Sequence, residues 1–424
     1  WLKLGFISFG GPAGQIAIMH EFLVEKKKWI SESRFLHALN YTMILPGPEA
    51  QQLATYTGWL LHGTRGGLVA GILFVLPSMF ILLGLAMLYV SFGNVPWVYA
   101  MFEGLKPAVL AIVIVALVKI GRKSLHTPFH FFVAGLGFVC MFFLNLPFPI
   151  VIVGSLVLAV LARRFWPQLF RETVASKEQF AQDESGYFIN GHEEISNAGF
   201  RLSRLSKQLL MAVLIWSSVF LLFYSFSNDF EFWRKLSLFF TQAALVTFGG
   251  AYAVLPYVAQ VSVEQMNWLT ELQMIDGLAL GETTPGPLVM VLVFVGFMAG
   301  YNHFGGSMGM GALGLIATTF FTFLPCFLFI FAGAPIIEKT RENNRIKQAL
   351  TIVTAAVVGV ILNLTIYLGK AVIVPQGFEF GSLNFSTLVW VLVSFFALFR
   401  LKLNMMVWIG LSAVFGLCNF LFLQ

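Results

Sequence analysis

The sequence predicts an all-α polytopic membrane protein, with two inverted-topology repeats and broken or re-entrant helices at Gly/Pro motifs. Three observations predict this fold class: a shortage of charge, many long apolar runs, and an internal repeat. Of the 424 residues, 58% are hydrophobic and only 11% are charged. A soluble domain needs about 25% charged residues to cover its surface. Lipid must therefore cover much of this chain.

The apolar runs are of two kinds. A helix needs about 20 apolar residues to cross the hydrocarbon of a bilayer. Nine uninterrupted runs are predicted to do so: 66–91, 98–119, 129–145, 147–163, 207–226, 308–333, 349–369, 386–399 and 404–423. Four further stretches are each broken midway by glycine, proline or both: 2–23, 36–62, 236–258 and 275–301. Each of these either spans once or enters the bilayer and returns.

The internal repeat sets the domain organisation. Three motifs recur 239 residues later: Phe9-Gly10-Gly11 as Phe248-Gly249-Gly250, Trp29 as Trp268, and Pro46-Gly47-Pro48 as Pro285-Gly286-Pro287. After an insertion, Leu76-Pro77 recurs as Leu324-Pro325, 248 residues later. A fixed period is the signature of a repeated structural unit. The sequence therefore predicts an N-terminal repeat over 1–166, a polar linker over 167–206, a connecting transmembrane helix and loop over 207–235, and a C-terminal repeat over 236–424.

Loop charges predict the orientation of the two repeats. The connecting helix adds one crossing between the halves, and this would turn the second half upside down. Because each crossing changes sides, successive loops lie on alternate sides of the membrane, and this places most basic loops on one side. That side is cytoplasmic by the positive-inside rule, and the linker belongs to it. The basic cluster Lys26–Lys28 joins it only if 2–23 and 36–62 are re-entrant, and the corresponding loop 259–274 holds no Lys or Arg. We therefore expect hairpins and an inverted repeat.

Several function classes are excluded. The net charge of +6 does not indicate nucleic acid, because the basic residues lie between apolar runs. Cys140, Cys326 and Cys418 lie inside apolar runs without metal-ligand spacing, so they are predicted to be small core residues. No metal, no other cofactor and no enzymatic activity is expected, since no phosphate loop or nucleophile motif is present. The chain opens at Trp1 rather than methionine, and we expect residues before it.

The breaks in the apolar stretches predict an anion site. Proline suits the first turn of a helix, so Pro12, Pro48 and Pro287 would each open a half-helix. The first N–H groups of such a helix have no internal partner, and its dipole end is positive. Several half-helix starts meeting at membrane depth make an anion site without many basic residues. The alternative is that the breaks are kinks that only relieve packing.

Polar side chains cluster beside the breaks, where hydroxyl and amide donors suit a tetrahedral oxyanion. Some of them would instead bond to freed backbone groups. The first half offers Ser8, Gln15, Asn40, Glu49, Gln51, Gln52 and Tyr56. The second half offers Thr247, Tyr252, Glu282, Thr283 and Thr284.

Three charged residues are candidates for coupling or charge. A carboxylate within the hydrocarbon is costly and is usually functional or paired. Glu49 and Glu282 are therefore predicted to carry protons that couple transport to a proton gradient; the alternative is that either caps a helix start. Lys106, in the middle of an apolar helix, either supplies positive charge to the site or extends to the interface. His20, Glu21 and Asp276 are weaker candidates.

The motifs also resemble a known family. FGGPAGQIAIMHEFL, HALNYTMILPGPEAQQLATYTGWLLHG, FGGAYAVLPYV and LALGETTPGP resemble the two-domain form of the chromate transporter (CHR) family over essentially the whole chain. The resemblance implies chromate efflux that confers chromate resistance, with sulfate as a structural mimic, driven by membrane potential or protons across a bacterial inner membrane. It implies a substrate-binding role for the break residues Gly10, Gly11, Pro12, Gln15, Pro46, Gly47, Pro48, Gln51, Gly249, Gly250, Tyr252, Thr284, Pro285, Gly286 and Pro287. One departure is that Ala251 occupies the position matched to Pro12.

Alternatives to a chromate exporter remain open at this point. The chain could carry sulfate or another dianion, or it could be a passive anion channel. An embedded enzyme is a further alternative, for which no catalytic set is visible. Besides the oxyanion, the expected partners are the lipid bilayer, protons and a second copy of the chain in a homodimer.

Overall fold

The computed structural model describes residues 1–9, 11–43, 45–93, 95–165, 186–189, 202–227, 229–248, 250–337, 344–374 and 384–423. The named elements in these ranges are all helical, and one isolated bridge pairs Ile30 with Ile189. The prediction of an all-α chain is confirmed. Gly10, Gly249 and most of the predicted linker 167–206 lie outside the described residues.

The elements follow in two series that α8 separates. Before it come α1 (Leu2–Ile7), α2 (Gly11–His20), the π-helix η1 (Glu21–Lys26), α3 (Glu32–Thr42), α4 (Glu49–Phe92), α5 (Pro96–Ser124), α6 (Pro128–Phe142) and α7 (Phe148–Phe165). α8 covers Leu202–Ser227. After it come α9 (Phe230–Val246), α10 (Ala251–Ala259), the π-helix η3 (Gln260–Gln265), α11 (Glu271–Thr283), the short 3₁₀ turn η4 (Leu288–Met290), α12 (Val291–His303), α13 (Met308–Ile337), α14 (Asn344–Ile373), α15 (Phe385–Phe399) and α16 (Met405–Leu423).

Seven helices in the described part of the chain are long and apolar enough to cross a membrane: α4, α5, α7, α8, α13, α14 and α16. Two of the nine predicted crossings, 129–145 and 386–399, correspond to the shorter apolar helices α6 and α15, and their crossing of the membrane stays a prediction. α6 and α15 have only 15 residues each, about 22 Å of helix against a hydrocarbon thickness of about 30 Å. α6 ends early because Asn145 adopts a left-handed conformation with φ of 49°, and α15 ends at the charged Arg400.

All four interrupted stretches are broken where the glycine and proline motifs stand. α1 and α2 are separated near Ser8, and α3 ends before the Pro46-Gly47-Pro48 motif that precedes α4. In the second half, α9 and α10 are separated at Gly250, and α11 ends before Pro285-Gly286-Pro287. Glycine provides the positive φ that each break requires, and proline cannot continue the preceding helix.

The first broken pair in each half folds back as a hairpin. The rings of Trp1 and Trp29 lie 6.1 Å apart, which brings the start of α1 next to the end of η1. The rings of Phe240 and Trp268 also lie 6.1 Å apart, which brings α9 next to the end of η3. Phe240 and Trp268 are the residues 239 positions after Trp1 and Trp29. The two hairpins are therefore closed by matched aromatic contacts.

The second broken pair also reverses direction. α4 is two helical segments joined at His62 and Gly63, where φ and ψ leave the helical region. A Cβ on Gly58 would lie 2.5 Å from the Cβ of Ala70, so the segments on either side of the reversal pack against each other. In the second half, the Asn302 side chain donates to the Trp268 carbonyl at 2.7 Å, which ties the end of α12 to the turn before α11.

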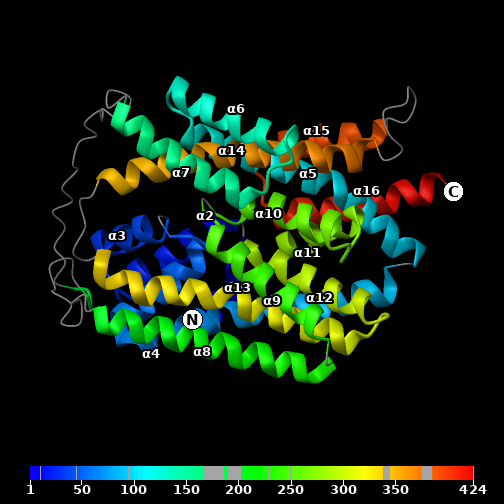
Figure 1. Cartoon of the computed structure of the whole chain (residues 1–424). Coiled ribbons are helices and arrows are strands. Elements are labelled where there is room, and N and C mark those ends of the chain that lie inside the picture. Colours follow the sequence, from blue (N-terminus) through cyan, green and yellow to red (C-terminus); the bar gives the residue numbers. More distant parts are fainter. Residues whose placement is uncertain are drawn as a thin grey trace.

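The last helices of each half pack on the other half. α5 and α14 lie against each other in the centre of this layer. α6 and α7 pack on α14, whereas α15 and α16 pack on α5 (Figure 1). Glycines permit the closest approaches: a Cβ on Gly104 would lie 2.6 Å from the Cα of Gly416, and one on Gly137 would lie 2.9 Å from the Ala356 carbonyl. The halves are thus interlocked.

Candidate functional site at the crossed helix breaks

The four breaks meet in two pairs, and each pair joins one half to the other. The Gly286 amide donates to the Ser8 carbonyl at 2.7 Å, and the Gly47 amide donates to the Thr247 carbonyl at 2.7 Å. Thr247 and Gly286 stand 239 residues after Ser8 and Gly47. Each bond is therefore the counterpart of the other under exchange of the halves. The residue just before the Phe-Gly-Gly motif of each half therefore accepts a hydrogen bond from the Pro-Gly-Pro motif of the other half.

First-half side chains hold the break at Pro285-Gly286-Pro287. The Gln15 side chain on α2 donates to the Gly286 carbonyl. The Ser78 hydroxyl on α4 donates to the Pro285 carbonyl at 2.5 Å. Gly286 has a φ of +93°, and a Cβ there would collide with the Ser78 hydroxyl. Both the backbone conformation and the neighbouring side chain therefore require glycine at this position.

The break at Pro46-Gly47-Pro48 is held in a similar way. The Gln52 side chain donates to the Pro46 carbonyl at 2.7 Å. Gly47 has a φ of +123°, and a Cβ there would lie 2.9 Å from the sulfur of Cys326. Cys326 follows Ser78 by 248 residues, so the residue that packs on each glycine is also matched between the halves. The buried Cys326 lies in the core, as predicted, and packs against the break. The same prediction is wrong for Cys418, which is exposed.

The helix starts at the breaks have no side-chain caps. α4 begins after Pro48, α10 after Gly250 and η4 after Pro287, and none of these N-cap residues makes a side-chain cap bond. α2 begins at Gly11, which has a φ of +69° and open space where a Cβ would stand. The first amides of these helices carry partial positive charge. The structure therefore brings several uncapped helix starts into the centre of the molecule.

Two acidic residues lie among these helix starts. A Glu49 carboxylate oxygen lies 3.8 Å from the position of a Cβ on Gly250, which places this first-half acid at the start of second-half α10. The Tyr252 hydroxyl on α10 donates to the Glu282 carboxylate on α11 at 2.7 Å, and both side chains are buried. A buried carboxylate needs such a donor. Glu282 is thus a buried acid that Tyr252 holds by a hydrogen bond beside the break at 284–287.

The remaining predicted site residues differ in what they contact. Pro12 is the second residue of α2 and is half-buried. The Thr284 hydroxyl donates to the Gly281 carbonyl at 2.9 Å, so it serves a freed backbone group. The Gln51 amide nitrogen donates to the Thr55 hydroxyl at 3.0 Å, and its buried Oε1 has no partner among the described residues. Gln51 retains a polar atom for a ligand or a water.

Lys106 contacts residues away from the helix breaks. Its ammonium pairs with Glu103 on the same helix and lies 5.5 Å from the centroid of the Tyr99 ring. The Tyr89 hydroxyl on α4 donates to Asp276 on α11 at 2.9 Å, and Asp276 is within electrostatic range of Lys106. Lys106 is only 4% exposed, so it does not extend to the surface. It belongs to a second polar cluster between α4, α5 and α11.

Sequence reasoning did not assign two residues that pack on the breaks, Ser78 and Cys326, and it named Gln52 only as a polar candidate. The signal for two of them was present in the repeat. Leu76-Pro77 recurs as Leu324-Pro325, and the next residue in each half is small and polar or polarisable. A position fixed by the repeat and adjacent to a helix proline merits attention as a site neighbour. Gln52 was recognised as polar, but nothing in the sequence showed that it would bond to Pro46.

The fold defines a multi-pass helical membrane protein in which interrupted helices from both halves meet. The chain belongs to the chromate transporter family, whose family model matches residues 1–161 and 234–417. It is 31% identical to a chromate transport protein of Pseudomonas aeruginosa, over 87% of this chain and 80% of that protein.

Two further relatives have similar coverage. One is a chromate transport protein of Cupriavidus metallidurans, 28% identical over 88% of this chain and 82% of that protein. The other is named a probable chromate transport protein of Synechococcus elongatus, 29% identical over 87% of this chain and 83% of that protein. No solved structure matches the chain.

Proposed function

We propose that this chain is a secondary active transporter that exports chromate across a bacterial inner membrane and thereby confers chromate resistance. The observation that carries the proposal is the matched pair of bonds between halves, Gly286 to Ser8 and Gly47 to Thr247. These bonds gather uncapped helix starts in the protein centre. Helix starts of this kind bind oxyanions through backbone amides and the helix dipole.

The arrangement of the helix ends supports an inverted repeat with a cytoplasmic linker side. In Figure 1, α3 and the end of α7 lie at the left. Arg34 belongs to α3, and Arg163 and Arg164 belong to the last turn of α7. The turns after α4 and α12 lie at the right, and these turns hold no Lys or Arg. The positive-inside rule makes the left end cytoplasmic. The hairpin closed by Trp29 then enters the membrane from the cytoplasmic side, and the hairpin closed by Trp268 enters it from the outer side.

Membrane potential is sufficient to drive export. Moving one charge through 100 mV is worth about 2.3 kcal/mol, so a dianion leaving an inside-negative cell gains about 4.6 kcal/mol. That corresponds to a gradient of more than about a thousandfold. A proton carried by Glu49 or Glu282 would add to this drive. Coupling to potential, to protons or to both is therefore consistent with a charged cargo and a site that contains two acids.

Transport in proteoliposomes tests the proposal. Purified protein would be reconstituted with a potassium gradient and valinomycin to set the potential, and labelled chromate would be followed. We expect chromate to accumulate against its concentration gradient when potential or a pH gradient is imposed. An imposed potential would also drive an anion through a passive channel, so the arm with a pH gradient and the potential clamped at zero distinguishes the two. Chromate flux that responds only to the potential and to its own gradient would identify a passive anion channel instead.

Cells that produce the protein test substrate and direction. We expect them to grow at higher chromate concentrations and to retain less chromate than cells with an empty vector. Growth without any gain in chromate resistance, together with sulfate flux in the liposomes, would show that the cargo is sulfate or another dianion. The same preparation, run on a sizing column in detergent, tests the proposed homodimer.

A further inference from the structure

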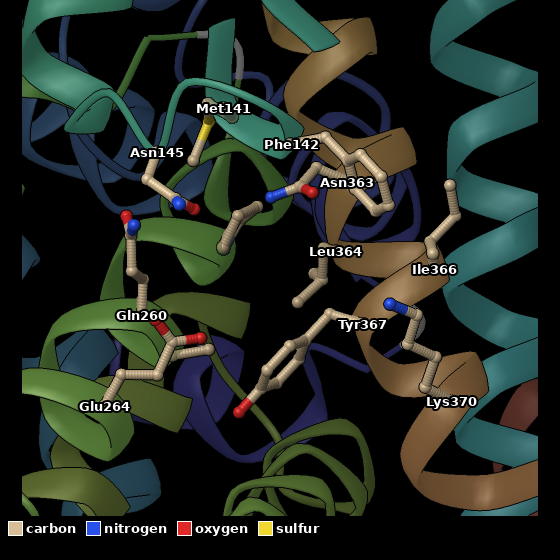
Figure 2. A pocket seen from close by; sticks show the side chains of 12 residues that line it. Met141, Phe142, Asn145, Gln260, Glu264, Asn363, Leu364, Ile366, Tyr367 and Lys370 are labelled. Carbon is tan, nitrogen blue, oxygen red and sulfur yellow. The ribbon is translucent and has the colours of Figure 1, made fainter. Parts of the chain in front are cut away.

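A polar pocket lies apart from the helix breaks. It has a volume of about 170 Å³ and is lined by the turn after α6, by α10 and η3, and by the second half of α14. The amides of Asn145, Gln260 and Asn363 gather at one end of it, and Glu264, Tyr367 and Lys370 line the rest (Figure 2). Apolar side chains from Met141, Phe142, Leu364 and Ile366 complete the wall.

The position of the pocket connects it to the breaks. α10 starts at Gly250, inside the crossed breaks, and Pro256, Ala259 and Gln260 line the pocket further along the same helix. With 1.5 Å per residue, Pro256 is about 8 Å along the helix from its start. The pocket therefore lies between the breaks and one end of the protein.

That end is the outer one in the orientation given above. α6 begins just after the basic residues Arg122 and Lys123, and α14 begins among Arg345 and Lys347. Both helices run away from these basic ends, and the pocket lies at their far ends. An exported anion would reach this pocket after it leaves the breaks.

The polar groups that line the pocket are suited to an oxyanion that carries one proton. Three amides, the Tyr367 hydroxyl and the Lys370 ammonium are donors, whereas the Glu264 carboxylate can only accept when ionised. An oxyanion without a proton has nothing to donate to Glu264 and is repelled by it. An oxyanion that carries one proton donates that proton to Glu264 and accepts from the other groups. The volume equals about five waters, enough for an oxyanion with part of its hydration shell.

The charged groups around Glu264 favour the sharing of a proton. Partial burial, and secondarily the neighbouring Glu271, raise the pKa of Glu264. Tyr367 of α14 also interacts with Glu264, and Lys370 of the same helix lines the pocket. Lys370 is positioned by the Phe142 ring, whose centroid is 5.3 Å from its ammonium.

We propose that this pocket is an outer oxyanion subsite in which Glu264 selects an oxyanion that brings one proton. Chromate is partly protonated near neutral pH, whereas sulfate is fully ionised there. Glu264 would thus discriminate chromate from sulfate, two tetrahedral dianions of similar shape. The inference rests on the proposed transport of chromate and adds the residue that determines its specificity.

The test compares how well sulfate inhibits labelled chromate flux in proteoliposomes at pH 7. For the unmodified protein, we expect sulfate to inhibit only weakly. In Glu264→Gln the amide can donate to a fully ionised oxyanion, so we expect sulfate to inhibit at a concentration about tenfold lower, the effect of one charged hydrogen bond. Glu264→Asp keeps the carboxylate and should keep the preference. Glu231→Gln is the matched control. Glu231 is an exposed acid on α9, away from the pocket, and it pairs with Arg234 on the same helix.

The outcomes separate this inference from the proposed function. Absence of chromate flux in the unmodified protein would overturn the proposed function. Normal flux with an unchanged sulfate-to-chromate ratio in Glu264→Gln would overturn the role of Glu264. An equal change in Glu231→Gln would show a general surface-charge effect and would also overturn it. Glu264 is exposed, so its substitution should not prevent folding, and the melting temperature of each variant checks this.

Discussion

At the scale of single residues, the site depends on glycines whose conformation other residues rarely adopt. Gly47 and Gly286 have positive φ, and each packs directly on a side chain of a long helix, Cys326 or Ser78. Their amides make the two bonds between halves. A side chain at either position would strain the backbone and push the neighbouring helix away.

Replacing Gly286 should therefore abolish transport. Gly286→Ala places a methyl group against Ser78 and incurs about 1–3 kcal/mol of backbone strain, and Gly286→Val is worse. We expect chromate flux to fall at least about tenfold in an assay normalised to inserted protein. Gly84→Ala on α4 is the control, since a Cβ there meets open space. Normal flux in well-inserted Gly286→Val would contradict the site.

The Tyr252–Glu282 pair allows a separate prediction about proton coupling. Glu282→Gln keeps an acceptor for the Tyr252 hydroxyl but cannot carry a proton. We expect the pH dependence of flux to weaken, while half-saturation by chromate changes less than about threefold. Flux measured from pH 6 to 8 in liposomes checks this. An unchanged pH profile would remove Glu282 from the coupling mechanism.

At the scale of elements, the structure is built from helical hairpins tied at their open ends. One such tie joins the start of α9 to the end of α12, where His303 bonds to the Asp229 carboxylate at 2.8 Å. Asp229 also caps α9 by accepting from the Phe232 amide at 2.9 Å. The bond to His303, more than the cap, holds the pKa of Asp229 below its usual value.

The Asp229 bond predicts a pH-dependent stability. A carboxyl with a depressed pKa in the folded state stabilises the fold at neutral pH, and this contribution is lost as pH falls through that pKa. Asp229→Asn keeps a capping side chain but loses the charge. We expect its melting temperature to be lower than that of the unmodified protein at about pH 7, and the difference to shrink towards about pH 3. A constant difference across this range would contradict the role of the charge.

At the scale of the whole molecule, matched contacts relate the halves. Lys28 and Asn267 are 239 residues apart, and both adopt a left-handed conformation after the π-helix that closes their hairpin. Trp29 and Trp268 follow them and close the two hairpins. If the repeat is inverted, these matched turns face opposite sides of the membrane.

Thiol labelling in intact cells tests this inversion. Lys28 and Asn267 are both exposed, so a cysteine at either position should react when reagent reaches it. With a membrane-impermeant reagent, we expect Asn267→Cys to label in intact cells and Lys28→Cys only after lysis. The chain with only its native cysteines gives the background. Labelling of both variants from the same side would show parallel rather than inverted repeats.

Much of the architecture could be read along the chain. The apolar runs gave the long helices, because lipid exposure demands continuous hydrophobic sequence. The Gly/Pro motifs gave the four breaks, because their effect on the backbone is local. Prediction was less successful for α6, which ends at Phe142 rather than at 145, shortly before the left-handed Asn145. The end predicted for α15, at 399, agrees with the structure. Lys106 was recognised as unusual, but its partner Glu103 and its neighbour Asp276 were not foreseen.

The sequence by itself determined that this protein is a membrane-embedded duplicate with interrupted helices, since composition, local motifs and their repetition can all be read from the order of residues. Only the tertiary structure decided which break meets which. Gly286 pairs with Ser8 across 278 positions of chain, and Gly47 pairs with Thr247 across 200. Such pairings depend on how whole helices pack, with Gln15, Ser78 and Cys326 arriving from other elements, and no local pattern encodes that packing.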